Sequence, residues 1–264
     1  MKAVLRPARA EDAPAIVQLA TDGFHEERRS LFVYSCTGAD AFVRNHIATP
    51  PMLAERHYSV AEIPGQGIVG VIDLVRTATA IHLAYVAVAP EARGQGLAQT
   101  LLSFATYHFP VRLAEMQLDV FSDNRVAVDW YDRLGFESTS VAHWFCGALP
   151  VTDDDAAVRG FVSGMPVAEA AHARFGFSQF TVHASGNDYS VGRLGEAWFR
   201  VSDAGVVRDL QALHALRTLD ARRGLLVVTG ADDDMEGRGF TKVATAQRRR
   251  VGVEMLLERL RDSR

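Results

Sequence analysis

The sequence contains little cysteine: Cys36 and Cys146 are its two thiols in 264 residues. They lie far apart and outside any Cys-x-x-Cys pair, which argues against a disulfide scaffold and against a structural zinc site. So few thiols are typical of a reducing compartment, and we predict a cytoplasmic protein. The charged start of the chain, residues 1–14, lacks the apolar segment of a secretory signal, which agrees with that prediction.

Long apolar runs and an excess of charge are also missing. The longest stretch without Asp, Glu, Lys or Arg is Gly94–Val111, and its several polar side chains argue against a membrane span. The 28 basic and 32 acidic residues give a net charge of −4, so no overall electrostatic footprint for nucleic acid is present. The run AQRRRVG at 246–252 is interpreted as the solvated side of a helix.

With 48% hydrophobic residues, the chain is long enough for one large or two modest globular domains. Apolar periodicity and turn residues predict a first half in which strands and helices share one mixed sheet. The predicted strands are residues 3–8, 56–63, 67–77, 80–89 and 116–121, and the predicted helices are residues 11–24, 40–47, 96–109 and 122–136. This order favours an α/β fold of the mixed-sheet α+β type, in which a three-stranded antiparallel meander leads into a helical crossover.

The segment 146–157 is interpreted as a linker, and its run Thr152–Asp155 as a helix N-cap with acidic first-turn residues, not as a metal site. No metal is predicted. Beyond it the order of the first half is repeated, which indicates a degenerate internal duplication. The predicted helices are 166–177 and 206–219, the predicted strands are 178–183, 189–194, 197–202 and 225–230, and a helical stretch ends the chain.

One join between strand and helix carries two glycines, Gly94 and Gly96, which cost stability in a helix that serves packing alone. The phosphate-binding P-loop needs Gly-Lys-Ser/Thr at its end, and this loop has Gly96-Leu97-Ala98 instead. The dinucleotide fingerprint needs Gly or Ala where Gln99 stands, and it follows an early parallel strand, not a meander. Both patterns fit poorly.

A third pattern fits. The stretch VAVAPEARGQGLAQTLL resembles the acyl-CoA-binding signature of the GNAT superfamily of N-acetyltransferases, Arg/Gln-x-x-Gly-x-Gly/Ala after a strand that ends Val-x-Pro. Arg93, Gly96 and Ala98 match the signature, and Val88 and Pro90 precede it. The resemblance covers about residues 1–144 and implies the GNAT acyltransferase fold, acetyl-CoA as co-substrate and a domain at 1–148. The second half, 153–264, then resembles a degenerate GNAT-like copy in which VSDAGVVRDLQ replaces the glycine loop.

The resemblance also implies how CoA is held. A helix N-terminus presents backbone N–H groups and a partial positive charge that suit a pyrophosphate, and glycines let those groups approach it closely. The pyrophosphate is expected at Arg93, Gly94, Gln95, Gly96, Leu97, Ala98 and Gln99, the pantetheine arm along Val86, Ala87 and Val88, and further contacts at Asn124 and Tyr131. N-capping by Asp123 or Asn124 is an additional role compatible with a ligand contact.

By the same resemblance, Tyr131 is the expected general acid, which protonates the departing thiolate. The family often carries a glutamate six residues before the strand's final Val, and this chain has His82 there. A histidine titrates near neutral pH and is the candidate base, either directly or through a water molecule. A main-chain N–H near Val86 is expected to stabilise the oxyanion.

The acceptor pocket of the family is usually shaped by the segment between the first two helices. Phe24, Glu27 and Tyr34 are the candidate contacts for a cationic primary amine on a small molecule or peptide, although a solvated helix end explains the charges equally well. We therefore predict a cytoplasmic N-acetyltransferase that acts by direct attack in a ternary complex. Two alternatives remain open: an acyl-CoA sensor or scaffold, and a nucleotide-binding oxidoreductase. The second domain is expected to pack, to form a homodimer or to cover the acceptor site.

Overall fold

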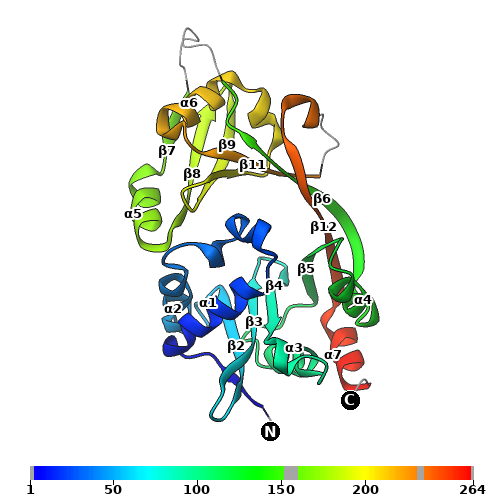
Figure 1. Cartoon of the computed structure of the whole chain (residues 1–264). Helices are drawn as coiled ribbons and strands as arrows, with labels where there is room; N and C mark the ends of the chain where they lie inside the picture. The colour runs from blue at the N-terminus through cyan, green and yellow to red at the C-terminus, as the bar shows by residue number, and fades with distance from the viewer. Residues whose placement is uncertain (1–2, 152–159, 231–234, 263–264) are drawn as a thin grey trace. The chain divides into compact units, whose positions relative to one another are not determined.

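A computed structural model describes residues 3–151, 160–230 and 235–262 of the chain (Figure 1). Contacts divide the chain into two compact units. The first unit consists of Met1–Glu26, Ala39–Ser140 and Gln247–Arg264, and the second of Glu27–Gly38 and Val141–Ala246. Each unit is therefore built from separate segments of the sequence.

The first unit contains a mixed sheet with helices on it. Its strands are β1 (Val4–Pro7), β2 (Arg56–Ile63), β3 (Gly67–Arg76), β4 (Ala80–Val88), β5 (Glu115–Phe121) and the second half of β12 (Thr241–Gly252), and they are ordered β1-β2-β3-β4-β5-β12. Its helices are α1 (Ala13–Asp22), α2 (Ala39–Ala48), α3 (Leu97–Tyr107), α4 (Arg125–Arg133) and α7 (Val253–Asp262), with short 3₁₀ turns η1 (Ala10–Asp12) and η4 (Pro90–Ala92).

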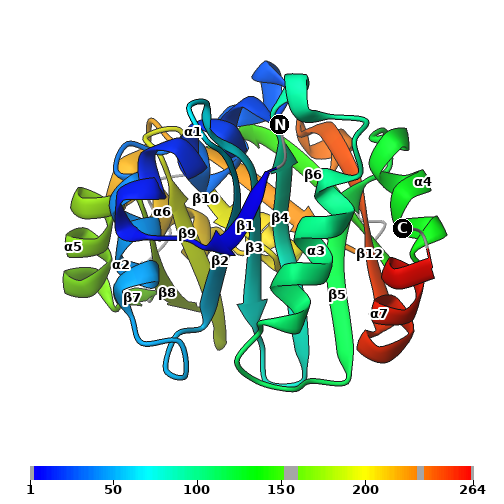
Figure 2. The ribbon, with the colours of Figure 1, turned by 90° about the horizontal axis from the view of Figure 1, so that it is seen from below.

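The predicted meander and crossover are present in this unit. β1 to β4 pair antiparallel in chain order, and β5, reached through α3, pairs parallel with β4. Leu83 packs with α3 in one core cluster. Residues two apart in a strand ordinarily share a face, but the bulge at Ala84 turns Tyr85 to the opposite face, where its hydroxyl bonds to Ala20 of α1. Figure 2 shows α3 in front of the strands of this unit.

The second unit repeats this order. Its strands are β6 (Glu137–Ala148, from Val141 onward), β7 (Phe161–Ser163), β8 (Phe177–Ala184), β9 (Asn187–Leu194), β10 (Trp198–Val201), β11 (Gly224–Thr229) and the first half of β12, and they are ordered β12-β6-β11-β10-β9-β8-β7. Its helices are α5 (Met165–Phe175) and α6 (Leu210–Asp220), and its 3₁₀ turns are η2 (Glu26–Leu31), η3 (Val33–Ser35), η5 (Ala204–Arg208) and η6 (Glu236–Arg238). β8, β9 and β10 form an antiparallel meander, and α6 leads to β11, which is parallel to β10.

Two long strands were not expected from the sequence. β6 runs through residues assigned to no element and to the linker, and β12 contains the run AQRRRVG, which was interpreted as the side of a helix. The interpretation of AQRRRVG is wrong because its arginines extend from a strand toward acidic partners: Arg248 pairs with Asp119, Arg249 with Asp132 and Arg250 with Glu115. The predicted terminal helix does form, as α7.

The compact units also differ from the continuous domains predicted at 1–148 and 153–264. Leu256 and Leu260 of α7 are buried in the same cluster as Leu101 of α3 and Met116 of β5, so the end of the chain completes the first unit. Burial of these leucines, which are distant in sequence from α3, cannot be recognised from local periodicity. The predicted helix cap at Thr152–Asp155 lies outside the described residues.

Among the helices that the structure describes, none is long and apolar enough to cross a membrane. Within residues 3–151, 160–230 and 235–262, no group of three or more His, Cys, Asp or Glu side chains is placed to hold a metal ion.

Candidate functional site

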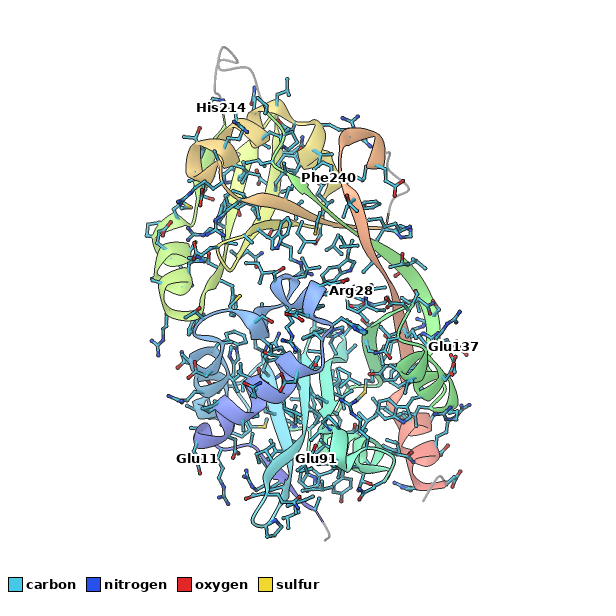
Figure 3. All side chains as sticks on the ribbon, in the orientation of Figure 1. Glu11, Arg28, Glu91, Glu137, His214 and Phe240 are labelled. Atoms are coloured by element: carbon cyan, nitrogen blue, oxygen red, sulfur yellow. The ribbon has the colours of Figure 1, made fainter. Side chains whose placement is uncertain are left out.

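The glycine loop joins β4 to α3 and is exposed. Gly94 and Gly96 have φ of 75° and 70°, the left-handed region that an L side chain adopts at a cost. A Cβ built on either glycine would meet no atom within 4 Å, so close packing does not require them. Glu91, labelled in Figure 3, lies in the turn that precedes the loop. The two glycines thus keep an open backbone surface at the start of α3.

The N-terminus of α3 meets the requirements of an anion site. Gly96 is its N-cap, no side chain caps it, and the first helical bond runs from the N–H of Thr100 to the carbonyl of Gly96. The N–H groups of Leu97, Ala98 and Gln99 therefore have no acceptor within the helix. Together with the helix dipole they favour a negatively charged group in front of the loop.

The edge of β4 is open beside this loop. β4 pairs with β5 from Ala80 to Leu83, and the pairing ends there although β4 continues to Val88. The N–H of Ala89 donates to the carbonyl of Val69 at 2.8 Å. Ala89 and, two residues earlier, Ala87 therefore direct their polar backbone groups toward β3. Val86 and Val88 consequently direct theirs toward the open side.

This alternation refines the expected backbone pairing of Val86, Ala87 and Val88. The carbonyl of Val88 accepts a hydrogen bond from Nε of Arg93 at 2.9 Å, so the arginine of the signature fixes the start of the loop against the strand end. Val86 therefore directs its N–H and carbonyl toward the side of β4 that β5 leaves unpaired. The N–H and carbonyl of Ala87 are hydrogen-bonded to β3.

Asn124 and Tyr131 lie on the next helix, α4. Asn124 is its N-cap, and Oδ1 accepts the N–H of Ala127 at 3.2 Å, so the capping role is confirmed. Tyr131 is buried, with its ring 4.9 Å from that of Trp130 and 5.4 Å from that of Phe136. Burial raises the pKa of the Tyr131 phenol, which keeps the hydroxyl protonated near neutral pH and able to donate a proton.

His82 lies on β4, four residues before Val86. Its Nε2 is 3.9 Å from Oδ2 of Asp119 on β5, and Arg248 holds both oxygens of that carboxylate at 2.7 Å. Burial lowers the pKa of His82, and the charge of Asp119 offsets part of this effect. The imidazole is therefore neutral at pH 7 and able to accept a proton.

His82 and Tyr131 are not in the same layer. Ile81 and Leu83 belong to the core cluster that contains Tyr131, and His82, between them, points to the opposite face of the sheet. A further tyrosine of β4 is Tyr85, whose Oη donates to the carbonyl of Ala20 at 2.5 Å and whose pKa is raised by burial. Tyr85 was not predicted as a site residue, although an aromatic residue directly before the predicted pantetheine stretch Val86–Val88 was a usable signal.

A charged pair on β2 and β3 was also missed. Asp73, 1% exposed, forms an ion pair with Arg56, and both groups act electrostatically on His82. An aspartate inside the apolar run GIVGVIDLVRT is the signal that could have revealed it, because a buried carboxylate needs a cationic partner.

The three candidate acceptor residues fall in different units. Phe24 belongs to the first unit, where its ring lies 5.0 Å from that of Tyr85. Glu27 and Tyr34 belong to the second unit, in which the neighbouring Ser30 bonds to Nε1 of Trp198 at 3.4 Å. Tyr34 is buried and Glu27 is exposed.

The corresponding helix of the second unit is already capped. Asp209 precedes α6, and its Oδ1 accepts the N–H groups of Gln211 at 3.0 Å and Ala212 at 3.1 Å. β10 pairs with β11 along its whole length, Trp198–Val201, so no open strand edge adjoins this helix start. A carboxylate of the chain itself occupies the position where the first unit has glycine.

Comparison with solved structures defines the fold. A tandem GNAT protein from the clavulanic acid biosynthesis pathway has a TM-score of 0.64 at 12% identity, covering 96% of this chain and 99% of that one. A GCN5-related N-acetyltransferase from Sphaerobacter thermophilus has a TM-score of 0.61 at 15% identity, covering 95% and 96%. A putative acetyltransferase from Pyrococcus horikoshii has a TM-score of 0.63 at 11% identity, covering 96% and 90%.

The chain thus has the mixed α/β fold of a tandem GNAT protein, as its sequence predicted. Within it, residues 54–138 match the family described as the acetyltransferase (GNAT) domain, a range that includes the glycine loop, Asn124 and Tyr131. The predicted resemblance is confirmed, and it supports acyl transfer as the general chemistry of the first unit. A comparison with curated proteins found no significant match.

Proposed function

We propose that the first unit is an acetyl-CoA-dependent N-acetyltransferase that acts on a primary amine of a small molecule or peptide. The observation that carries the proposal is the open backbone of the Arg93–Gln99 loop at the start of α3, beside the unpaired stretch of β4. One end of this surface suits a pyrophosphate, and the other offers strand edge to an extended amide chain.

The proposed roles are those implied by the resemblance, and several of them are supported by where the residues lie. The N–H groups of Leu97, Ala98 and Gln99 bind phosphate oxygens, and Asn124 lies at the start of the helix that carries Tyr131. Val86 holds the pantetheine arm through its outward backbone groups, and a main-chain N–H near Val86 stabilises the oxyanion. The co-substrate supplies the thioester.

Proton transfer is assigned to two side chains of opposite character. Neutral His82 takes a proton from the acceptor ammonium, directly or through water, since burial keeps its pKa low. Protonated Tyr131 gives its proton to the departing sulfur, since burial keeps its pKa high. Phe24, Glu27 and Tyr34 remain the proposed acceptor contacts, and the cytoplasm the proposed location.

The test is isothermal titration of acetyl-CoA into the full chain and into Gly96→Glu. The new side chain brings a carboxylate to the expected phosphate position, so binding at one site per chain should be lost. Gly239→Glu is the matched control, since Gly239 also has positive φ, 82°, and open space around it, but lies in the second unit. Absence of binding by the unchanged chain overturns the proposal, and two sites per chain overturn the assignment to the first unit alone.

One observation favours a second function, an acyl-CoA sensor: histidine, not glutamate, stands at the base position of β4. A sensor should bind acetyl-CoA in the same titration and show no turnover with any primary amine. A transferase should show turnover that depends on Tyr131.

A further inference from the structure

Three side chains of the second unit form a continuous hydrogen-bonded chain. Oγ of Ser163 lies 2.7 Å from Nε2 of His183, and Nδ1 of His183 lies 2.6 Å from Oδ1 of Asp188. The residues come from β7, β8 and β9, three neighbouring strands. None of them has a role in the proposed acyl transfer from CoA.

The strand register explains why they meet. Phe161 pairs with His183, and His183 pairs with Asp188, so the three side chains share one face of the sheet. Ser163 is two residues after Phe161 and faces the same way. The opposite face of β8 carries Phe180 and Val182 of the core, so the polar chain lies on the outer face.

The partners of His183 determine its tautomer. An ionised Asp188 can only accept a hydrogen bond, so Nδ1 of His183 carries the proton. Nε2 is then an acceptor, and the hydroxyl of Ser163 donates to it. This is the arrangement of a nucleophile, a base and a group that orients the base.

The surroundings hold the base in place, and the serine is open to solvent. The ring of Phe161 stacks on that of His183 at 4.3 Å and 18°, which fixes the plane of the imidazole. Ser163 is exposed to solvent. A cavity of about 480 Å³ next to the imidazole is lined by Phe161, His183 and Asp188 together with residues of the β8–β9 turn, and its lining does not include Ser163. Phe161, 62% exposed, offers this cavity an apolar wall.

A helix begins directly after the serine. Gly164 is the N-cap of α5, which is 11 residues long and has no side-chain cap, and the first helical bond runs from the N–H of Ala168 to Gly164. The first-turn N–H groups and the helix dipole therefore favour negative charge close to Ser163. A tetrahedral adduct on the serine would carry such a charge.

We propose that Ser163, His183 and Asp188 form a second catalytic site, which hydrolyses small activated carboxylic esters or thioesters with an apolar group. Oγ of Ser163 bonds to the carbonyl carbon while Nε2 of His183 takes the hydroxyl proton. The bond to the alcohol or thiol then breaks, and that group leaves with the proton from His183. Water attacks the acyl-serine, gives its proton to His183, and the serine regains a proton as the acid departs.

The proposal is tested on the full chain with p-nitrophenyl acetate and with a fluorophosphonate probe, which labels activated serines covalently. We expect hydrolysis and labelling at Ser163, located by mass spectrometry of peptides. Ser163→Ala should abolish both, and His183→Gln should lower the rate by about 10²–10⁴-fold, the usual contribution of a general base. Asp188→Asn should cause a smaller loss because its carboxylate is 74% exposed.

Ser190→Ala is the matched control. Ser190 lies on β9, its hydroxyl bonds to Gln179, and its loss should leave the rate unchanged. Thermal unfolding of each variant separates loss of the site from loss of the fold. Gly96→Glu should keep full hydrolysis, which makes this result independent of the proposed acyl transfer. Failure of the unchanged chain to label, or hydrolysis that survives Ser163→Ala, overturns the proposal.

Discussion

Nε2 of His82 lies 3.9 Å from Oδ2 of Asp119, a carboxylate that Arg248 holds through two hydrogen bonds of 2.7 Å. The strand that carries Arg248 returns to the first unit after the chain has formed the second. The electrostatic environment of the candidate base His82 thus depends on Arg248, which lies 166 positions later in the sequence.

The first prediction concerns the pKa of His82. Burial lowers it, so NMR titration should give a value below the ordinary histidine value of about 6.5. Since the negative charge of Asp119 raises it, Asp119→Asn should lower it further and move the acidic limb of kcat/KM to lower pH. The other charged groups that act on this imidazole, Arg248, Asp73 and Arg56, are unchanged in that variant.

His82→Gln assigns the NMR resonance of His82, because that resonance disappears in the variant. The acidic limb of the pH profile of kcat/KM should also disappear. Asp188→Asn, which alters the partner of His183 in the second unit, is the control and should leave the titration of His82 unchanged. A pKa that rises in Asp119→Asn would contradict the electrostatic account. A limb that persists in His82→Gln would contradict the role of His82 as base.

The second prediction concerns Tyr131→Phe. Loss of the proton donor should lower kcat by about 10²–10⁴-fold, the usual effect of removing a general acid. Burial, not a hydrogen bond, sets the pKa of Tyr131, so the ring should pack as before and acetyl-CoA should still bind. Steady-state kinetics and titration of acetyl-CoA separate the two effects.

Tyr107→Phe is the control for this change, because Tyr107 is 73% exposed on α3. It should retain the full rate. A Tyr131→Phe protein that retains it too would remove Tyr131 as the acid.

The third prediction concerns Asp209. Its carboxylate caps α6 and also accepts hydrogen bonds from Ser185 at 2.9 Å and from Tyr189 at 3.1 Å. Asp209→Ala should lower the free energy of unfolding by about 1–3 kcal/mol, because the helix cap is lost and the buried hydroxyl of Tyr189 loses its acceptor. Chemical denaturation measures the change, and Glu236→Ala, at an exposed position of η6, should be near neutral.

Asp209→Ala should not create a second binding site for acetyl-CoA. The strand beside α6, β10, would still be fully paired with β11, so no edge would be open to an extended ligand. Titration should still give one site per chain. A second site in this variant would show that the carboxylate alone keeps the second unit empty.

The fourth prediction concerns Leu256 of α7. Its side chain is fully buried among residues of α3 and β5, and Leu256→Ala should cost about 2–5 kcal/mol of stability. Hydrogen exchange should show faster opening of α3, with β8 and β9 unaffected. Met255→Ala is the neighbouring control, because Met255 is 49% exposed. Faster exchange in β8 instead would contradict the assignment of α7 to the first unit.

The sequence by itself determined the local elements of the site. The loop was predicted from the periodic apolar residues of β4 and α3, from Pro90, which ends the strand, and from the glycines at 94 and 96. The structure shows both glycines at positive φ. The N-cap role of Asn124 could likewise be predicted from the sequence, because short-range geometry determines caps and turns.

Tertiary structure alone decided the rest. Nothing near Arg248 in the sequence indicates Asp119 as its partner, and the triad-like contact of Ser163 with His183 arises from strand register. The same holds for the opening beside Val86, which exists because β5 stops pairing at Leu83. Local patterns report backbone preference and the face that is buried, whereas pairing between distant segments depends on how the whole chain buries its apolar surface.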